Sequence, residues 1–202
     1  MLINQVKSRI TTEPTDSLFE LDELKERLVI ETSEDDDLLQ AFLDSATDYS
    51  QQYTGIRFLN QTVTYYTDCL PASNEFLEIP SHNASAVTAI SYIDPADATQ
   101  TEDLADYYID TEAMSVKIKP ISGWPTIRAE GFNNFTVAVT EGWSTVDDVP
   151  DAIKQGVALL VGHYYRNRES TIIGTSATEL PLGSKAHLDV YRNIYRKDYG
   201  GF

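Results

Sequence analysis

The side chains that could do chemistry in this 202-residue chain are mostly carboxylates, of which there are 32. The densest run, Glu34–Asp37, has neither the alternating Asp spacing nor the later Glu of a calcium-binding loop. It stands directly before a hydrophobic pattern of helical period, where negative charge complements the positive end of the helix dipole. We therefore interpret the run as a solvated helix start and predict no metal site.

The three histidines and the single cysteine form no recognisable site. His82, His163 and His187 fall in different predicted elements, without the spacing that places two imidazoles on one metal. Cys69 is alone, which excludes an intramolecular disulfide and a cysteine metal cluster. The sequence also lacks a nucleophile elbow, a phosphate-binding loop and a dinucleotide fingerprint. We predict that the protein is not an enzyme and has no catalytic residue and no cofactor.

Aromatic side chains could instead bind a ligand. Trp124 and Trp143, together with Tyr107 and Tyr108, could form a flat surface of the kind used by carbohydrate-binding modules and hydrolases. No acid, base or nucleophile constellation accompanies these residues. A ligand-binding β module or a hydrolase is therefore the less favoured alternative.

The stretch VPDAIKQGVALLVGHYYRNRES, residues 149–170, begins as a core helix. Pro150 suits its first turn, where a missing N–H is harmless. Gly156 and Gly162 are unfavourable inside a helix, so they predict the close approach of another element. Apolar side chains at helical spacing predict the buried face. This face consists of Ile153, Val157, Leu160, Val161 and Tyr164.

The same helix ends in a cluster of tyrosine and arginine. Both residue types are enriched at the centres of protein interfaces. Cations at the end of a helix also complement its dipole, which is the alternative explanation. The candidate subunit-interface residues are Tyr164, Tyr165, Arg166 and Arg168.

Two further helices are predicted earlier in the chain. Residues 17–30 read as a short helix that Asp16 or Ser17 could cap. Residues 33–55 read as a longer helix ending at Gly55, where a left-handed cap is expected. The apolar positions of the longer helix are Leu39, Phe42, Leu43, Ala46, Tyr49 and Tyr53.

Between residues 56 and 143 the hydrophobic pattern changes to period two, interrupted by Pro, Asn, Asp and Gly. Strict alternation places Val87 and Ala89 on one face of a strand, with Thr88 and Ile90 on the other. The strand candidates are QTVTYYTDCL, EFLEIP, AVTAISYID, DYYID, SVKIKP and NFTVAVTEGW.

These elements predict an α+β fold. Three main helices and a short C-terminal helix form a helical core, and an antiparallel β domain is inserted between the second and third helices. We expect a flexible N-terminal arm at residues 1–16, the helical core at 17–56 and 149–170, and the inserted β domain at 57–148. Residues 171–202 are expected to form a loop, a short helix within SKAHLDVYRNIYR and a tail. The shared face of that short helix consists of Leu188, Tyr191 and Tyr195.

The formal net charge of −17 argues against tight DNA binding, because phosphate neutralisation needs clustered Lys and Arg. From Arg166 onward six basic residues exceed four acidic ones, a net of +2, so the first 165 residues carry −19. A basic end on an acidic body is typical of an interaction element or of a solvated terminus. The first residues lack the apolar segment of a signal peptide, and no window approaches 18 apolar residues, so we expect no membrane association.

The order of these motifs resembles that of the tailed-phage head–tail connector (adaptor) proteins, in particular the gp6-like connectors and the gp8-type DNA-packaging proteins. The resemblance runs from about Leu21 to Arg192. The family usually has a small residue where this chain has Glu141. The matching motifs are DELKERL, DDLLQAFLDSATDYSQQYTG, QTVTYYTD, AISYID, GWP, FTVAVTEGW, VPDAIKQGVALLVGHYYRNRES and LPLGSKAHLDVYR.

The resemblance implies a structural virion protein, made in the bacterial host cytoplasm and located at the head–tail junction. Such proteins form a homo-oligomeric ring, commonly dodecameric, that extends the DNA channel, and DNA passes through without specific binding. The implied partners are the portal protein and a tail-side neck, stopper or tail terminator protein. The alternative in the same class is a head-closure or tail-completion neck protein. The portal-binding candidates are Leu188, Tyr191, Arg192, Tyr195, Arg196, Tyr199 and Phe202.

Overall fold

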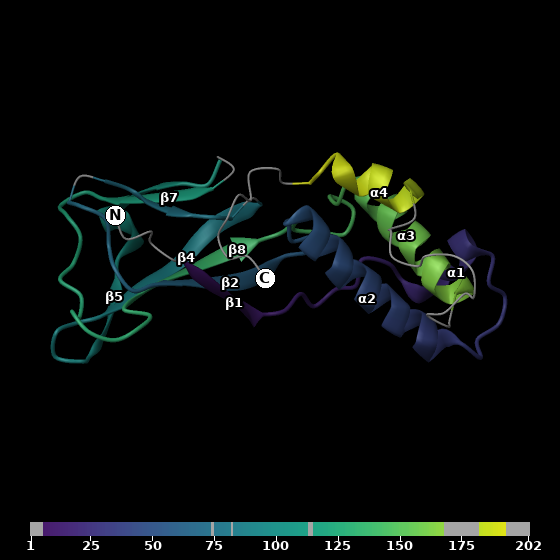
Figure 1. The fold of residues 1–202 in the computed structure, drawn as a ribbon, viewed down its shortest axis with the longest axis horizontal. Helices are drawn as coiled ribbons and strands as arrows, with labels where there is room; N and C mark the ends of the chain where they lie inside the picture. The colour runs from purple at the N-terminus through teal and green to yellow at the C-terminus, as the bar shows by residue number, and fades with distance from the viewer. Residues whose placement is uncertain (1–5, 74, 82, 113–114, 168–181, 193–202) are drawn as a thin grey trace, which may run out of the picture. The chain divides into compact units, whose positions relative to one another are not determined.

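The computed structural model describes residues 6–73, 75–81, 83–112, 115–167 and 182–192. Within these residues the fold is α+β, with four α-helices and two antiparallel sheets (Figure 1). The chain divides into two compact units. The helical unit contains the described parts of residues 15–59 and 144–193, and the β unit contains those of residues 1–14 and 60–143.

The predicted boundaries of the β domain, 57 and 148, fall inside the helical unit. The segment after the second helix is tied back to that helix, because the Phe58 N–H donates to the Gln51 side chain over 3.0 Å. Phe58 and Val149 are both fully buried. The period of the hydrophobic pattern does not reveal such contacts. The predicted β domain, residues 57–148, is therefore longer at both ends than the observed segment, residues 60–143.

The β unit contains a five-stranded sheet and a three-stranded sheet. All six predicted strands are present. The larger sheet has the order β1 (Lys7–Thr12), β2 (Gln61–Thr67), β8 (Phe135–Glu141), β4 (Ala84–Ile93) and β5 (Thr99–Glu102). The smaller sheet has the order β3 (Leu77–Ile79), β7 (Val116–Pro120) and β6 (Tyr107–Asp110), and a short 3₁₀ turn, Leu104–Asp106, leads into β6.

The predicted flexible arm at residues 1–16 is wrong for residues 7–12, which form strand β1. β1 pairs antiparallel with β2, with Lys7 opposite Tyr66 and Ile10 opposite Val63. All six residues of β1 are exposed. A strand without a buried face shows no apolar alternation, so only its pairing with β2 identifies it.

The predicted alternation along β4 is also wrong. The register of β4 against β8 shifts between Val87 and Ala89, which marks a β-bulge or comparable irregularity. Val87 and Ile90 are both buried, although strict alternation placed them on opposite faces. An extra residue in the strand reverses the order of inward and outward side chains.

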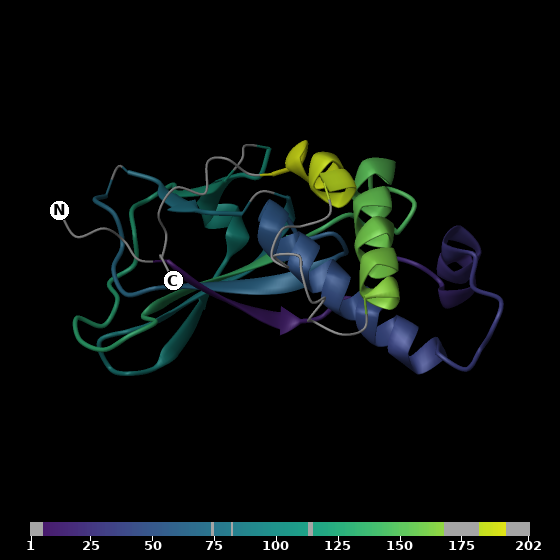
Figure 2. The same cartoon turned by 45° about the vertical axis from the view of Figure 1, so that its right-hand side comes forward.

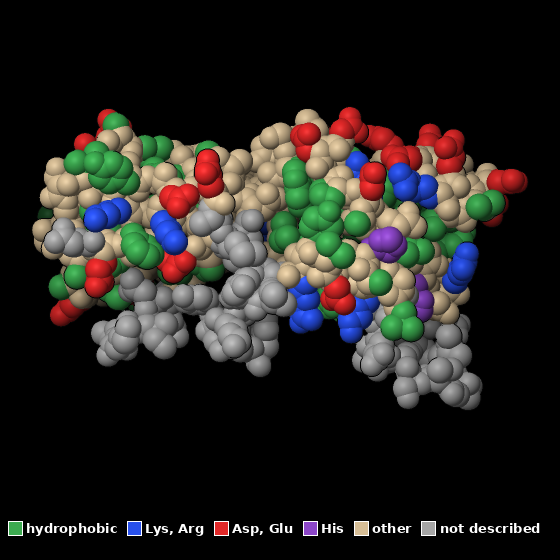
Figure 3. Space-filling model, turned by 90° about the horizontal axis from the view of Figure 1, so that it is seen from above, with side chains coloured by type: hydrophobic (Ala, Val, Ile, Leu, Met, Phe, Trp, Pro, Cys, Tyr) green, Lys and Arg blue, Asp and Glu red, His purple; other side chains and the backbone are tan. Residues whose placement is uncertain are grey.

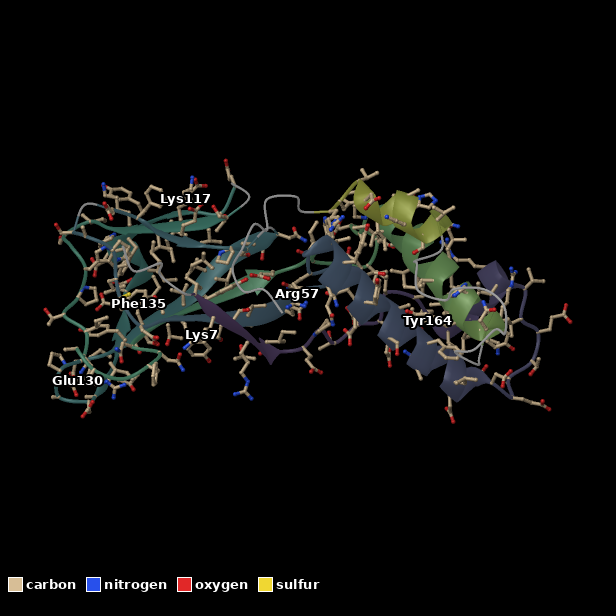
Figure 4. All side chains as sticks on the ribbon, in the orientation of Figure 1. Lys7, Arg57, Lys117, Glu130, Phe135 and Tyr164 are labelled. Atoms are coloured by element: carbon tan, nitrogen blue, oxygen red, sulfur yellow. The ribbon has the colours of Figure 1, made fainter. Side chains whose placement is uncertain are left out.

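The core of the β unit gathers residues from both sheets. Fully buried Phe135, labelled in Figure 4, makes an edge contact with Trp124 at a ring-centroid distance of 5.6 Å. Glu141 is buried and accepts a hydrogen bond from the Tyr65 hydroxyl. This bond satisfies a polar group that would otherwise be costly to bury.

The helical unit consists of α1 (Leu21–Leu28), α2 (Asp36–Thr54), α3 (Asp151–Arg166) and α4 (Leu182–Asp189). Glu20 is the N-cap of α1 and makes no side-chain cap bond, so the predicted cap by Asp16 or Ser17 is wrong. Gly55 ends α2 with a positive φ of 75°, as predicted. A partly buried ion pair joins α1 to the start of α2, with Lys25 Nζ 2.8 Å from Asp36 Oδ1.

The buried face of α2 is rotated from the predicted one. Leu39, Leu43 and Ala46 are buried as predicted, and Ser50 and Thr54 complete that face. Tyr49 is 42 % exposed, which excludes it from the core. Small polar residues, Ser50 and Thr54, thus occupy the buried positions of the last turns, and Tyr53 is half-buried.

Two glycines of α3 provide the close approach that the sequence predicted. A Cβ at Gly156 would lie 3.0 Å from Leu188 Cγ, and one at Gly162 would lie 3.0 Å from Leu28 Cδ2. Figure 2 shows α4 beside the N-terminal half of α3, where Gly156 lies. Ile153, Val157, Leu160 and Val161 are buried as predicted, and Tyr164 is half-buried.

Candidate functional site

The C-terminal end of α3 carries three of the four predicted interface residues. Tyr164, labelled in Figure 4, packs against Phe42 of α2 with ring centroids 6.0 Å apart. Burial raises the pKa of the Tyr164 phenol above its ordinary value, and the nearby Tyr49 adds to the shift. Tyr164 is therefore a neutral, half-buried ring that joins α3 to α2.

The other members of this cluster differ in their environment. The Tyr165 hydroxyl donates to Asp35 Oδ2 over 2.9 Å, which ties the end of α3 to the start of α2. Arg166 is exposed at the end of the helix, where its charge complements the dipole. Arg168 lies outside the described residues. Tyr164 and Tyr165 thus have roles within the chain, and a subunit contact by any of the four remains a prediction.

Helix α4 has a core position of its own. Leu188 is 0 % exposed and packs into the space that the missing side chain of Gly156 leaves on α3, here called the notch. The Ser184 hydroxyl donates to the Gly156 carbonyl over 2.7 Å. The Ser184 bond satisfies a hydroxyl that is itself completely buried. The short helix predicted after α3 is therefore packed within the chain through Leu188 and Ser184.

A polar cluster joins the end of α4 to α2. The Tyr53 hydroxyl donates to Asp189 Oδ1 over 2.5 Å, and the Arg192 guanidinium lies 5.0 Å from the centre of the Tyr53 ring. Burial raises the pKa of Tyr53, and the hydrogen bond to Asp189 raises it further. The sequence suggested Tyr53 only as a core residue, because its partner is more than a hundred positions away.

These contacts change the interpretation of the portal-binding candidates. Leu188 is a core residue of the helical unit, so its assignment as a portal contact does not hold in this conformation. α4 ends at Asp189, so Tyr191 and Arg192 lie in a following turn and not on a helical face shared with Leu188. Arg192 is exposed and Tyr191 is half-buried. The remaining candidates, Tyr195, Arg196, Tyr199 and Phe202, lie outside the described residues.

The aromatic residues considered for ligand binding do not form one flat surface. Tyr107 is buried in the β-unit core and packs against Trp124 with ring centroids 6.1 Å apart. Tyr108 follows it on the same strand and is exposed, so the two rings point to opposite sides. Trp124 also donates its indole N–H to the Glu75 carbonyl over 3.3 Å. Tyr107 and Trp124 therefore serve the core.

Across the described part of the chain, no three His, Cys, Asp or Glu side chains are grouped so that they could hold a metal ion. Among the same residues, no helix is both long and apolar enough to cross a membrane. The space-filling view in Figure 3 instead shows acidic side chains gathered along one edge of the helical unit, with histidines farther from that edge.

Solved structures with the same fold come from phage-like particles. The chain is similar to a protein in the "Neck of empty GTA particle computed with C6 symmetry", with a TM-score of 0.75, 18 % identity and coverage of 93 % of this chain and 96 % of that chain. It is also similar to a chain in the "Virion of native gene transfer agent (GTA) particle", with a TM-score of 0.72, 18 % identity and coverage of 93 % and 95 %.

A third similar structure is the "Neck of native GTA particle computed with C12 symmetry", with a TM-score of 0.69, 17 % identity and coverage of 93 % of this chain and 96 % of that chain. At these identities the likeness establishes the fold alone. A search of curated proteins found no match.

The family comparison is more decisive than the fold. The model of the head completion protein family matches residues 17–194, which is most of the 202-residue chain. This match confirms the resemblance to phage head–tail connector and head completion proteins, and with it the prediction of a structural protein without enzymatic activity. The chain belongs to the head completion protein family, whose members are structural proteins of the virion.

Proposed function

We propose that this protein forms a homo-oligomeric ring at the head–tail junction of a tailed phage or phage-like particle. The ring joins the portal to the tail-side neck or stopper protein and extends the DNA channel. The single observation that carries the proposal is the likeness, over 93 % of the chain, to proteins in neck structures with sixfold and twelvefold symmetry. A ring of twelve subunits is compatible with both symmetries.

The charge distribution supports a channel wall without DNA affinity. Residues 15–59, which contain α1 and α2, carry twelve acidic residues against three basic ones. Like charge discourages a passing phosphate backbone from sticking to the protein surface. The acidic helical unit is therefore suited to line the channel. The protein would be made in the host cytoplasm and then assembled into the virion.

The residues after α4 are the proposed portal contact. Asn193–Phe202 contains three aromatic and two basic residues in ten positions, a composition that favours interfaces. Exposed Arg192 directly precedes this segment and extends its basic character. Net positive charge there would suit an acidic surface on the portal.

The test is native mass spectrometry of the full chain, alone and mixed with the portal protein of the same particle. We expect either a ring of identical subunits or a stable complex that appears with the portal. A chain that stays monomeric and ignores the portal would contradict the proposal, and would favour a head-closure or tail-completion protein on the tail side.

Deletion of Asn193–Phe202 tests the portal contact separately. We expect the shortened chain to melt like the full chain but to lose portal binding. The matched control replaces the same ten residues by a Gly-Ser sequence of equal length, which keeps the reach of the chain and removes its chemistry. Portal binding by either altered chain at the level of the full chain would exclude this segment.

A further inference from the structure

The helical unit carries two exposed surfaces of opposite charge. We infer that the subunits of the proposed ring join head to tail through these surfaces, with the exposed side of α4 on one copy seated on an acidic groove beside α1 of the next copy. The inference rests on the proposed ring and adds to it the two surfaces that meet.

The acidic groove is an open hollow of about 480 Å³ beside α1. Lys25 is the one cation among its lining residues, and its charge is already neutralised by Asp36 at 2.8 Å. Val29 is 83 % exposed at the groove and holds a left-handed backbone conformation with a φ of 57°, which is rare for a β-branched residue. The groove therefore offers apolar surface with an acidic rim. Its lining residues are Asp22, Lys25, Glu26, Val29, Ile30 and Glu31.

The second surface, here called the α4 face, combines exposed apolar side chains with positive charge. Leu182 is 82 % exposed and Val190 is 75 % exposed, and exposed Lys185 lies between them in the sequence. These positions lie away from the buried side of the helix, which is formed by Ser184 and Leu188. Asp189 and Arg192, at the end of the helix, are engaged with Tyr53 of α2 and are not part of this face. Apolar side chains beside a cation match an apolar groove rimmed by carboxylates.

α1 and α4, which carry the two surfaces, pack on different sides of α3, and this arrangement allows a ring. α1 contacts α3 at Gly162, and α4 contacts it at Gly156, six positions earlier. Six residues of an α-helix correspond to a rotation of roughly 120° between the two contacts around the α3 axis. Two different, complementary surfaces on separate sides of one subunit form a head-to-tail contact, which generates rings when the rotation closes.

A second copy of the chain explains both surfaces at once. A portal or tail protein seated on the α4 face would leave the acidic groove and Val29 uncovered. Pairing the two surfaces between identical subunits covers Val29, Leu182 and Val190 together. It also places Glu26 and Glu31 opposite Lys185.

The test uses two charge-reversed forms of the full chain. The groove variant is Glu26→Lys/Glu31→Lys, and the face variant is Leu182→Glu/Lys185→Glu. Each places like charges across the proposed contact, so we expect the subunit concentration needed for half-assembly to rise by at least about tenfold. Native mass spectrometry, with and without the portal, reads assembly, and thermal melting followed by circular dichroism verifies that each variant is folded.

An equimolar mixture of the two variants should restore the ring. In an alternating ring every basic groove meets an acidic α4 face and every acidic groove meets a basic one. The mass should then show equal numbers of the two forms, which an even-numbered ring permits. This rescue also separates a specific contact from a general effect of changed net charge.

The matched control for the groove variant is Asp44→Lys/Asp48→Lys, which makes the same charge change at exposed positions of α2 outside the groove. We expect the control to assemble like the unchanged chain. Assembly of the groove and face variants at the level of this control, or no rescue in the mixture, would overturn the inference while leaving the ring intact. Failure of the unchanged chain to assemble, even with the portal, would overturn the ring itself.

Discussion

Gly156 is the residue on which the attachment of α4 depends. Any Cβ there would meet Leu188 Cγ at 3.0 Å, and the Gly156 carbonyl accepts the buried Ser184 hydroxyl. A glycine inside a helix costs about 1 kcal/mol relative to alanine. Here that cost is offset by the burial of Leu188, which has no exposed surface.

Substitutions at this notch should show how much of the stability depends on the packing of Leu188 against Gly156. Leu188→Ala should lower the free energy of unfolding by about 2–5 kcal/mol, because it leaves a cavity in a fully buried site. Gly156→Val should lower it by about 1–3 kcal/mol, because the added methyl groups overpack the contact with Leu188. Urea unfolding followed by circular dichroism measures both.

The control for the notch is Gly183→Ala. A Cβ at Gly183 would meet Leu159 Cδ1 at 3.4 Å, an ordinary contact, so stability should stay unchanged or rise slightly. A Gly156→Val protein as stable as the unchanged chain would show that α4 does not depend on this notch.

At the scale of elements, β1 protects the edge of the larger sheet. β2 lies directly beside it and consists of β-branched, aromatic and polar residues, Gln61–Thr67. β1 buries no side chain of its own. It is held by its backbone pairing with β2, by the Thr11 hydroxyl 3.0 Å from the Thr64 hydroxyl, and by Lys7 Nζ 3.8 Å from Asp68 Oδ2. An unpaired strand edge of this composition is a template for association with another chain.

Deletion of residues 1–12 should therefore expose β2. We expect a lower melting temperature and concentration-dependent self-association, which sedimentation velocity at several concentrations would detect. Arg9→Pro is a matched variant within the strand, because it removes one backbone donor and keeps the chain length. A shortened chain that melts normally and does not associate would show that β1 is dispensable for the sheet edge.

At the scale of the whole molecule, the dominant property is the net charge of −17. A protein that neutralises phosphates needs clustered cations, and α1 and α2 present the opposite charge. Six of the 15 basic residues lie from Arg166 onward, in the part of the chain where partner binding is proposed. Such a charge distribution disfavours binding of DNA phosphates by the body of the molecule.

We predict no retention of double-stranded DNA by the full chain at physiological salt. Fluorescence anisotropy with a short labelled duplex, at salt concentrations from about 50 to about 200 mM, would measure this. Non-specific DNA-binding proteins show dissociation constants of about 10⁻⁴ to 10⁻⁶ M and a steep loss of affinity with salt. Binding in that range with such a slope would contradict a passive channel wall.

The sequence by itself determined the type and order of most elements. Helical spacing identified α2 and α3, alternation identified six strands, and Gly55 marked a helix end. These features depend on residues within a few positions of one another, so they can be read locally. The order of the motifs also sufficed to indicate the family that residues 17–194 match.

Only the tertiary structure decided which surfaces these elements bury. The register shift in β4 turned Val87 and Ile90 to the same side, and Leu188 proved to be a core residue. Strand β1 and the acidic groove beside α1 were likewise not predicted. The physical reason is distance along the chain: Leu188 packs on Gly156 and Ile10 pairs with Val63. Such partners leave no periodic signal in the sequence, because each contact depends on where the whole fold brings two distant segments together.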